Sequence, residues 1–133
     1  MLKYAERPPG TGLHFVDNWM SHLSIFLGYA AAGAQILLYQ LGGMSMRRGA
    51  IMGGGLGVVA PLLWLTANPK TYENAGNSIQ FYSGTVIEGS ETIAQAGDRL
   101  YQGVLDIASG TLSKVETIRY REPLMAYTKD PVF

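Results

Sequence analysis

Two adjacent arginines, Arg47 and Arg48, stand where a bound ligand could meet them. They lie in a glycine-rich segment from Gly42 to Gly57, which follows an apolar run that we expect to form a strand. Open parallel sheets bind ligands at the carboxyl ends of their strands, and a guanidinium group can hold a carboxylate through two parallel hydrogen bonds. The pair therefore predicts an anion site, and the alternative is a solvated basic pair. Because the segment contains seven glycines, we expect it to order only on a neighbouring domain, a second subunit or an anion.

Other side chains that could perform acid–base or metal chemistry are few and scattered. Asp17 follows the first predicted strand, where it could cap a helix or join a ligand site, and His14 and His22 are separated along the chain. The chain has no cysteine and only these two histidines, so we expect no disulfide, no thiolate chemistry and no zinc site. No nucleophile and base can be paired from the residue order. The residues predict a ligand site without a complete catalytic set and without a tightly bound metal.

The sequence Gly55-x-Gly57-x-x-Ala60 has the spacing of a dinucleotide-binding fingerprint. That fingerprint must follow a strand and open a helix, so that the helix N-terminus meets a pyrophosphate. Here an apolar run that contains Pro61 comes next. The context therefore argues against a nucleotide site.

Composition narrows the class of protein. Ten Lys and Arg residues balance ten Asp and Glu residues over 133 positions, so no global charge favours nucleic acid. The first residues lack the apolar core of a signal peptide, and we expect a cytoplasmic location. Ala50 to Thr66 is 17 residues without a charge, which is the lower limit for a membrane-spanning helix. Its glycines and Pro61 favour a turn and a buried strand instead, so no membrane segment is expected.

The alternation of short apolar runs with helical spacing predicts an α/β fold: a Rossmann-like, three-layer domain with a mainly parallel sheet. Residues 1–11 are polar and contain prolines, so they are interpreted as a linker or arm, and residues 12–133 as the domain. Strands are expected at Leu13–Val16, Ala34–Leu38, Val58–Leu65 and Ile79–Tyr82, and helices at Trp19–Gly33, near Lys70–Gly76 and from about Ser90 to Gly110.

Two helix starts carry local signals. Asn68 followed by Pro69 is typical of an N-cap and a first helical residue, and Ser90 is expected to cap the longest helix. Gly33 and Gly110 are expected to end their helices. The buried stripe of the longest helix is predicted to consist of Ile93, Gly97, Leu100, Val104 and Ala108.

An ordered series of short motifs resembles a known family. The motifs are Tyr4-Ala5-Glu6-Arg7-Pro8, Gly12-Leu13-His14-Phe15-Val16-Asp17, Ala31-Ala32-Gly33-Ala34-Gln35, Ala60-Pro61, Thr66-Ala67-Asn68-Pro69-Lys70-Thr71-Tyr72, Gly84-Thr85-Val86-Ile87-Glu88-Gly89 and Ala108-Ser109-Gly110, with Lys114 and Glu116 beyond. In this order they resemble the C-terminal domain of the altronate/galactarate dehydratase family, which also includes sulfolactate sulfo-lyase large subunits.

The resemblance implies a part of a metal-dependent lyase that removes water from sugar acids. Family members are several times longer, so this chain would be the substrate-side C-terminal domain, inactive on its own. Fe(II) or Mn(II) is implied for the full-length enzyme and no cofactor for this chain alone. The implied partners are the remaining domains or subunit, a possible second copy of the chain, and a small sugar acid or related anion.

The sequence departs from the family pattern at four positions. Gly43 replaces an arginine, Trp64 a lysine, Gln80 an aspartate and Tyr82 an asparagine or aspartate. Losing these groups suggests a less charged ligand, or none, unless Arg47 and Arg48 replace the missing positive charge. The alternative function is therefore a non-catalytic structural or oligomerising module that has lost the family site. The candidate substrate-binding residues are Asp17, Gly42, Gly43, Arg47, Arg48, Asn68, Gln80 and Tyr82, and catalytic residues cannot be assigned.

Overall fold

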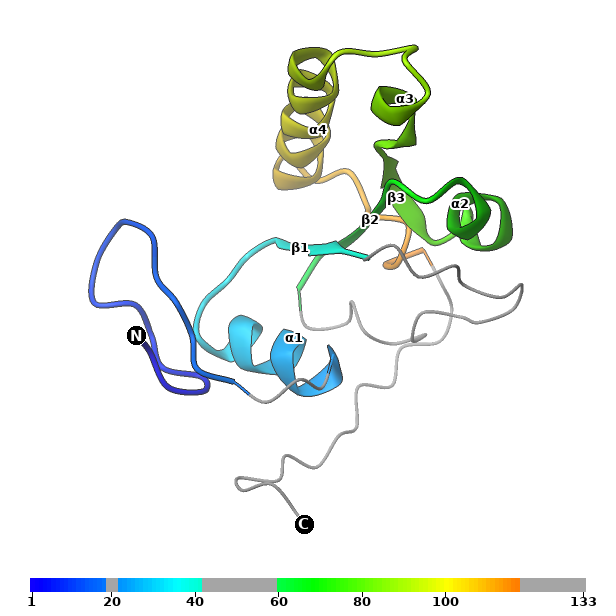
Figure 1. Cartoon of the computed structure of the whole chain (residues 1–133). Coiled ribbons are helices and arrows are strands. Elements are labelled where there is room, and N and C mark those ends of the chain that lie inside the picture. Colours follow the sequence, from blue (N-terminus) through cyan, green and yellow to red (C-terminus); the bar gives the residue numbers. More distant parts are fainter. Residues whose placement is uncertain (19–21, 42–59, 118–133) are drawn as a thin grey trace.

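The structure, a computed structural model, describes residues 1–18, 22–41 and 60–117 (Figure 1). The described residues contain both helices and parallel strands, as the sequence predicts for an α/β domain. In chain order the elements are α1 (His22–Ala31), β1 (Leu37–Gln40), β2 (Leu62–Thr66), α2 (Pro69–Ala75), β3 (Ile79–Tyr82), α3 (Gly84–Ile87) and α4 (Ile93–Ala108).

The described strands form one parallel sheet in the order β1-β2-β3. The central strand β2 is buried at all five of its residues, which explains its uninterrupted apolar sequence. Its pairing with β3 contains an irregularity: Trp64 pairs with Ile79 and Leu65 with Phe81, so Gln80 is skipped. A residue skipped in this way bulges out of the ladder and redirects its side chain.

Helices cover both faces of this sheet (Figure 1). On one face, Phe26 of α1 packs with Leu37, Leu62 and Trp64. On the other face, Ala96 of α4 packs with Leu65 and Phe81. The domain is therefore a small α/β unit with a three-stranded, all-parallel sheet between helices.

Several predicted elements are confirmed. β3 has the predicted bounds, and α2 begins after Asn68, whose side chain accepts a hydrogen bond from the backbone N–H of Thr71. Gly33 and Gly110 follow the ends of α1 and α4 with φ of 102° and 104°. These left-handed values favour glycine at the position after a helix.

The predicted strand Leu13–Val16 is wrong. Val16 makes only an isolated parallel bridge with Leu2, and Leu13 and Phe15 are 85% and 69% exposed. The segment pairs with the first residues of the chain, because the backbone N–H of Leu2 donates to the carbonyl oxygen of Phe15 over 2.6 Å. An apolar run that gains no second neighbour remains a loop rather than a sheet strand.

Two other strands are shifted from their predicted bounds. β1 begins at Leu37 rather than at residue 34, because Ala34 is part of the turn that ends α1 and donates its N–H to the carbonyl oxygen of Tyr29. β2 begins at Leu62, while positions 58 and 59 of the predicted strand lie outside the described residues. No helix among the described residues is long and apolar enough to cross a membrane.

The predictions for α4 are wrong in two respects. Its N-cap is Thr92, not Ser90, because Ser90 belongs to the turn that ends α3 and donates its N–H to the carbonyl oxygen of Thr85. The predicted stripe is only partly right: Ala96 and Ile107 are the residues that α4 buries, and Leu100 of the stripe packs against the cluster of Leu65, Phe81 and Ala96, whereas Ile93 is 79% exposed. The short helix α3 was not anticipated.

Candidate functional site

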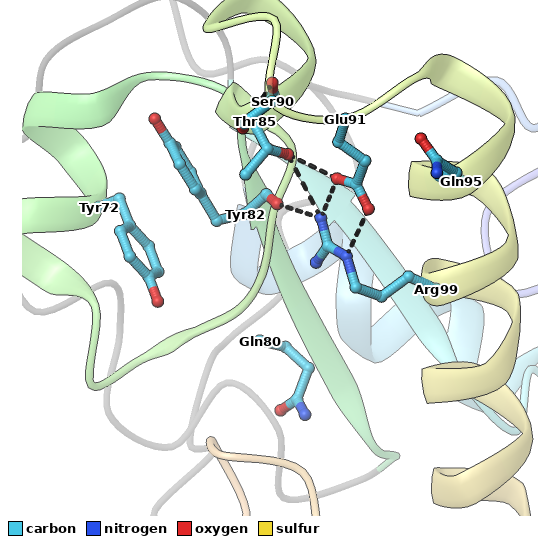
Figure 2. A pocket seen from close by; sticks show the side chains of 8 residues that line it. All are labelled: Tyr72, Gln80, Tyr82, Thr85, Ser90, Glu91, Gln95 and Arg99. Atoms are coloured by element: carbon cyan, nitrogen blue, oxygen red, sulfur yellow. Dashed lines mark hydrogen bonds and ion pairs between the residues drawn. The ribbon is translucent and has the colours of Figure 1, made fainter.

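An open pocket of about 550 Å³ lies beside β3, between α2 and α4. Figure 2 shows the side chains that surround it. Because β3 ends at Tyr82, the pocket includes the carboxyl edge of the sheet, where parallel sheets place ligands. Its lining residues come from four elements and one loop: Tyr72, Gln80, Tyr82, Thr85, Ser90, Glu91, Gln95 and Arg99.

An ion pair between Glu91 and Arg99 is the electrostatic centre of the pocket. Nε of Arg99 donates to Oε1 of Glu91 over 2.9 Å, and Nη2 donates to Oε2 over 2.6 Å. Nη2 also donates to the carbonyl oxygen of Tyr82 over 2.9 Å. The guanidinium carbon lies 4.2 Å from the ring centroid of Phe81, in the range of a cation–π contact. Arg99 thus joins α4 to the end of β3.

Thr85 completes this network by donating its hydroxyl to Oε2 of Glu91 over 2.6 Å. The hydrogen bonds from Arg99 and Thr85 lower the pKa of Glu91 to about 2, although desolvation opposes the shift. The hydrogen bonds that Arg99 donates to Glu91 raise the pKa of Arg99. Both groups are therefore charged near neutral pH, and Glu91 is too weakly basic to act as a general base there.

Tyr82 forms the wall of the pocket opposite Arg99, together with Tyr72. The two rings stack with centroids 4.5 Å apart and planes 15° apart. The hydroxyl of Tyr82 donates to Glu88 over 2.5 Å, and this bond is the main reason that its pKa is raised to about 12. Near neutral pH, Tyr82 is a protonated phenol whose proton is directed to Glu88.

The position of the Tyr82 ring depends on Gly84. A Cβ atom at position 84 would lie 2.0 Å from the hydroxyl oxygen of Tyr82 and 2.1 Å from the adjacent ring carbon. No such contact is possible without moving the ring. The absence of a side chain at position 84 therefore permits the aromatic wall.

Gln80 and Gln95 are each held by backbone N–H groups. Oε1 of Gln80, at the bulge of β3, accepts from the N–H of Lys114 over 2.8 Å. Oε1 of Gln95 accepts from the N–H of Thr92 over 2.9 Å, as part of the capping box that starts α4. A backbone N–H can only donate, so these bonds identify which amide atom is oxygen.

The residues predicted as a ligand site lie in different places. Gln80 and Tyr82 line the pocket. Asn68 caps α2 through its side chain, and Asp17 is in an exposed N-terminal loop, where its N–H donates to the carbonyl oxygen of Leu2. The other four predicted positions lie outside the described residues: Gly42, Gly43, Arg47 and Arg48.

Sequence reasoning missed six of the lining residues. Tyr72 belonged to a matched family motif but was not given a site role. Gln95 and Arg99 are one helical turn apart on α4, and this spacing places them on one face. That polar face could have been found from the sequence, whereas the contact of Glu91 with Arg99 depends on the turn between α3 and α4.

Two structural observations bear on the expected chemistry. Trp64, where the resemblance implies a lysine, is fully buried and packs edge-to-face with Phe26 and Tyr39, so it belongs to the core on the predicted buried strand. In residues 1–18, 22–41 and 60–117, no group of three or more His, Cys, Asp or Glu side chains could hold a metal ion. The described residues therefore do not fit a metal site.

Comparison with known proteins gives two matches. Residues 1–130 match a family described as "D-galactarate/Altronate dehydratase, C-terminal". The chain is also 27% identical over 122 residues to the (2R)-sulfolactate sulfo-lyase subunit beta of Chromohalobacter salexigens, a match that covers 92% of this chain and 29% of the relative. The chain thus spans less than a third of the length of that relative.

Proposed function

This chain belongs to the D-galactarate/altronate dehydratase family and corresponds to the C-terminal domain of that family. We propose that it is the substrate-side part of a lyase that acts on hydroxy acids. The family match over residues 1–130 is the observation that carries this proposal. The relative is named as a lyase subunit, which supports a partner chain or further domains for this protein as well.

The proposed reaction is the loss of water from a sugar acid. A base removes the proton from the carbon next to the carboxylate, a proton donor protonates the β-hydroxyl group so that it leaves as water, and the resulting enol becomes a 2-keto acid. A divalent metal such as Fe(II) or Mn(II) would be held by the rest of the enzyme, because the described residues of this chain do not fit one.

The role of this chain is to bind and orient the substrate rather than to remove the proton. Near neutral pH, Glu91 is a weak base because its pKa is about 2, and Tyr82 is a protonated phenol because its pKa is about 12. The pocket therefore offers hydrogen bonds and an aromatic wall but no proton acceptor suited to the reaction. This supports the expectation that the chain is inactive alone.

The type of fold, the substrate contacts and the location of the protein are part of the same proposal. The sheet with helices on both faces supports a Rossmann-like, three-layer domain, with residues 1–11 as a linker or N-terminal arm. Of the predicted site residues, Gln80 and Tyr82 are proposed to contact the substrate, because they line the pocket. A cytoplasmic location and a possible second copy of the chain complete the proposal.

A non-catalytic module is the second candidate function. The burial of Trp64 supports it, because a side chain in the aromatic core cannot replace the substrate-binding lysine that the family resemblance implies there. In this case the chain would provide structure or an oligomer interface. The family match is compatible with both functions.

One experiment distinguishes the two. The tagged chain is produced in its own host cells, purified with the proteins bound to it, and assayed with galactarate, altronate and sulfolactate in the presence of Fe(II) or Mn(II). The expected result is keto acid or sulfite release by the complex, and none by the chain purified alone. A complex that is inactive on all three compounds would favour the structural module.

A further inference from the structure

The carboxylate and most hydroxyl groups that line the pocket make hydrogen bonds within the protein, whereas several N–H donors that line it do not. The carboxylate of Glu91 accepts from Nε and Nη2 of Arg99 and from the hydroxyl of Thr85. The hydroxyl of Ser90 donates to the carbonyl oxygen of Thr85, and that of Tyr82 donates to Glu88. The acidic and hydroxyl groups of the pocket, except the Tyr72 hydroxyl, are thus engaged inside the protein.

Three NH₂ groups remain without an acceptor among the described residues. Oε1 of Gln80 and Oε1 of Gln95 are fixed by backbone N–H donors, so the Nε2 group of each amide is available to the pocket. Arg99 uses Nε and Nη2 for Glu91, and Nη1 makes no hydrogen bond to the described part of the chain. An ordered donor is a ready partner for an oxygen-rich ligand.

These donors are spread along the pocket rather than gathered at one point. In Figure 2 the guanidinium group of Arg99 lies between the amides of Gln80 and Gln95. A compact anion could meet only part of such a row. An extended chain with oxygen atoms along its length could meet all three, and its aliphatic hydrogens could lie against the stacked rings of Tyr72 and Tyr82.

We infer that this pocket is a donor-lined site for an extended polyhydroxy carboxylate, recognised by the Nε2 groups of Gln80 and Gln95 and by Nη1 of Arg99. The inference deepens the proposed function and rests on it for the class of acid. The pattern of free donors and engaged acceptors in the pocket is independent of the proposed function. Gln80 and Gln95 are then specificity-determining residues, because they donate hydrogen bonds to hydroxyl oxygen atoms that an unsubstituted acid would lack.

The test uses isosteric substitutions that keep the hydrogen bonds within the protein but replace a donor to the ligand by an acceptor. Gln80→Glu and Gln95→Glu each retain the oxygen that accepts from the backbone N–H, and glutamate is a normal partner in a capping box. Each change replaces the free NH₂ donor by a carboxylate oxygen. Gln35→Glu is the matched control, because Gln35 is exposed and does not line the pocket, yet the added charge is the same.

Binding to the full chain is measured by calorimetry with galactarate, and with galactitol as the neutral polyol of the same length. We expect galactarate to bind more tightly than galactitol, and each pocket variant to weaken galactarate binding by at least about tenfold, the cost of a lost donor facing a charged acceptor. Gln35→Glu should change it by less than about twofold. The melting temperatures of the two pocket variants should be close to that of Gln35→Glu.

Three results would overturn the inference: no galactarate binding by the wild-type chain, equal binding of galactitol, or pocket variants that bind as well as Gln35→Glu. None of these decides the proposed lyase function, which depends on the activity of the purified complex. Conversely, an inactive complex with galactarate-binding behaviour as expected would leave the donor-lined site in place on a non-catalytic module.

Discussion

The start of α4 provides the sharpest test of the local structure around the pocket. The hydroxyl of Thr92 accepts a hydrogen bond from the N–H of Gln95 over 3.2 Å, and the Gln95 side chain accepts from the N–H of Thr92 over 2.9 Å. The sequence alone points to Ser90 as the cap. We predict that Thr92→Ala destabilises the chain, whereas Ser90→Ala has little effect.

The magnitude follows from the capping bonds. Replacing a threonine N-cap by alanine costs about 1 kcal/mol in the free energy of unfolding, within a range of about 0.5 to 2 kcal/mol. A chain of 133 residues has an unfolding entropy of about 0.28 kcal/mol per kelvin near its melting temperature. Thr92→Ala should therefore lower the melting temperature by about 3 to 4 °C, and Ser90→Ala, which loses one exposed hydrogen bond of 3.2 Å, by about 1 °C or less.

Calorimetry of both variants at pH 7 checks the expectation, with urea unfolding as a second measure. Because the hydroxyl of Thr92 also donates to Oε1 of Gln95 over 2.8 Å, Thr92→Ala should weaken galactarate binding as well as stability, while Ser90→Ala should change stability little. The reasoning is refuted if Ser90→Ala lowers the melting temperature as much as Thr92→Ala does.

Three further predictions concern the same region. Glu91→Gln should lower the melting temperature at pH 7, and the difference from wild type should disappear as the pH falls from about 4.5 to about 2. The reason is that Arg99 lowers the folded-state pKa of Glu91, so the stabilising effect of the carboxylate is lost when it is protonated. A difference in melting temperature that stays constant over this pH range would contradict this. Gly84→Ala should displace the ring of Tyr82 and return its pKa from about 12 toward 10, which tyrosine-resolved NMR titration measures; an unshifted pKa would refute the steric argument. Lys114→Met should lower the free energy of unfolding by about 1 to 3 kcal/mol in urea titrations, because Nζ donates to two carbonyl oxygens in and just before β3, over 3.0 and 2.6 Å; an effect below about 0.5 kcal/mol would show that these bonds are solvent-replaceable.

The elements that the sequence predicted well are those with local signals. Asn68 and Pro69 define the start of α2 by their own conformational preferences. Ile79 to Tyr82 is a short β-branched and aromatic run between turn residues, and it forms β3 with the same bounds. In these cases the information needed lies within a few residues.

The errors arise where tertiary contacts decide. Leu13 to Val16 has the composition of a strand, but its pairing partner is Leu2, close to the N-terminus, rather than the sheet. Ser90 has the composition of a cap, but the turn that ends α3 already uses it. Neither competitor can be recognised from local propensity, because each is a contact made by another segment.

The buried face of α4 shows the same limit. The helix carries apolar residues over a wide arc, and only a part of that arc, at Ala96 and Ile107, is buried. Tyr101 and Leu105 lie on the opposite side of the helix and are 66% and 40% exposed. Helical periodicity gives the width of an apolar face, but the position of the sheet under it decides which residues are covered.

The site itself illustrates why residue replacement alone is a poor guide to loss of function. Gln80 stands where the family resemblance implies an aspartate, and taken alone it suggests a lost base or metal ligand. In the structure, the bulge of β3 and the N–H of Lys114 fix its amide, so the residue has an ordered donor where a carboxylate would have had none. Arg99 provides a guanidinium group from α4 at the same pocket. A change from acceptor to donor at one edge of a sheet alters which ligands fit, and it need not remove the site.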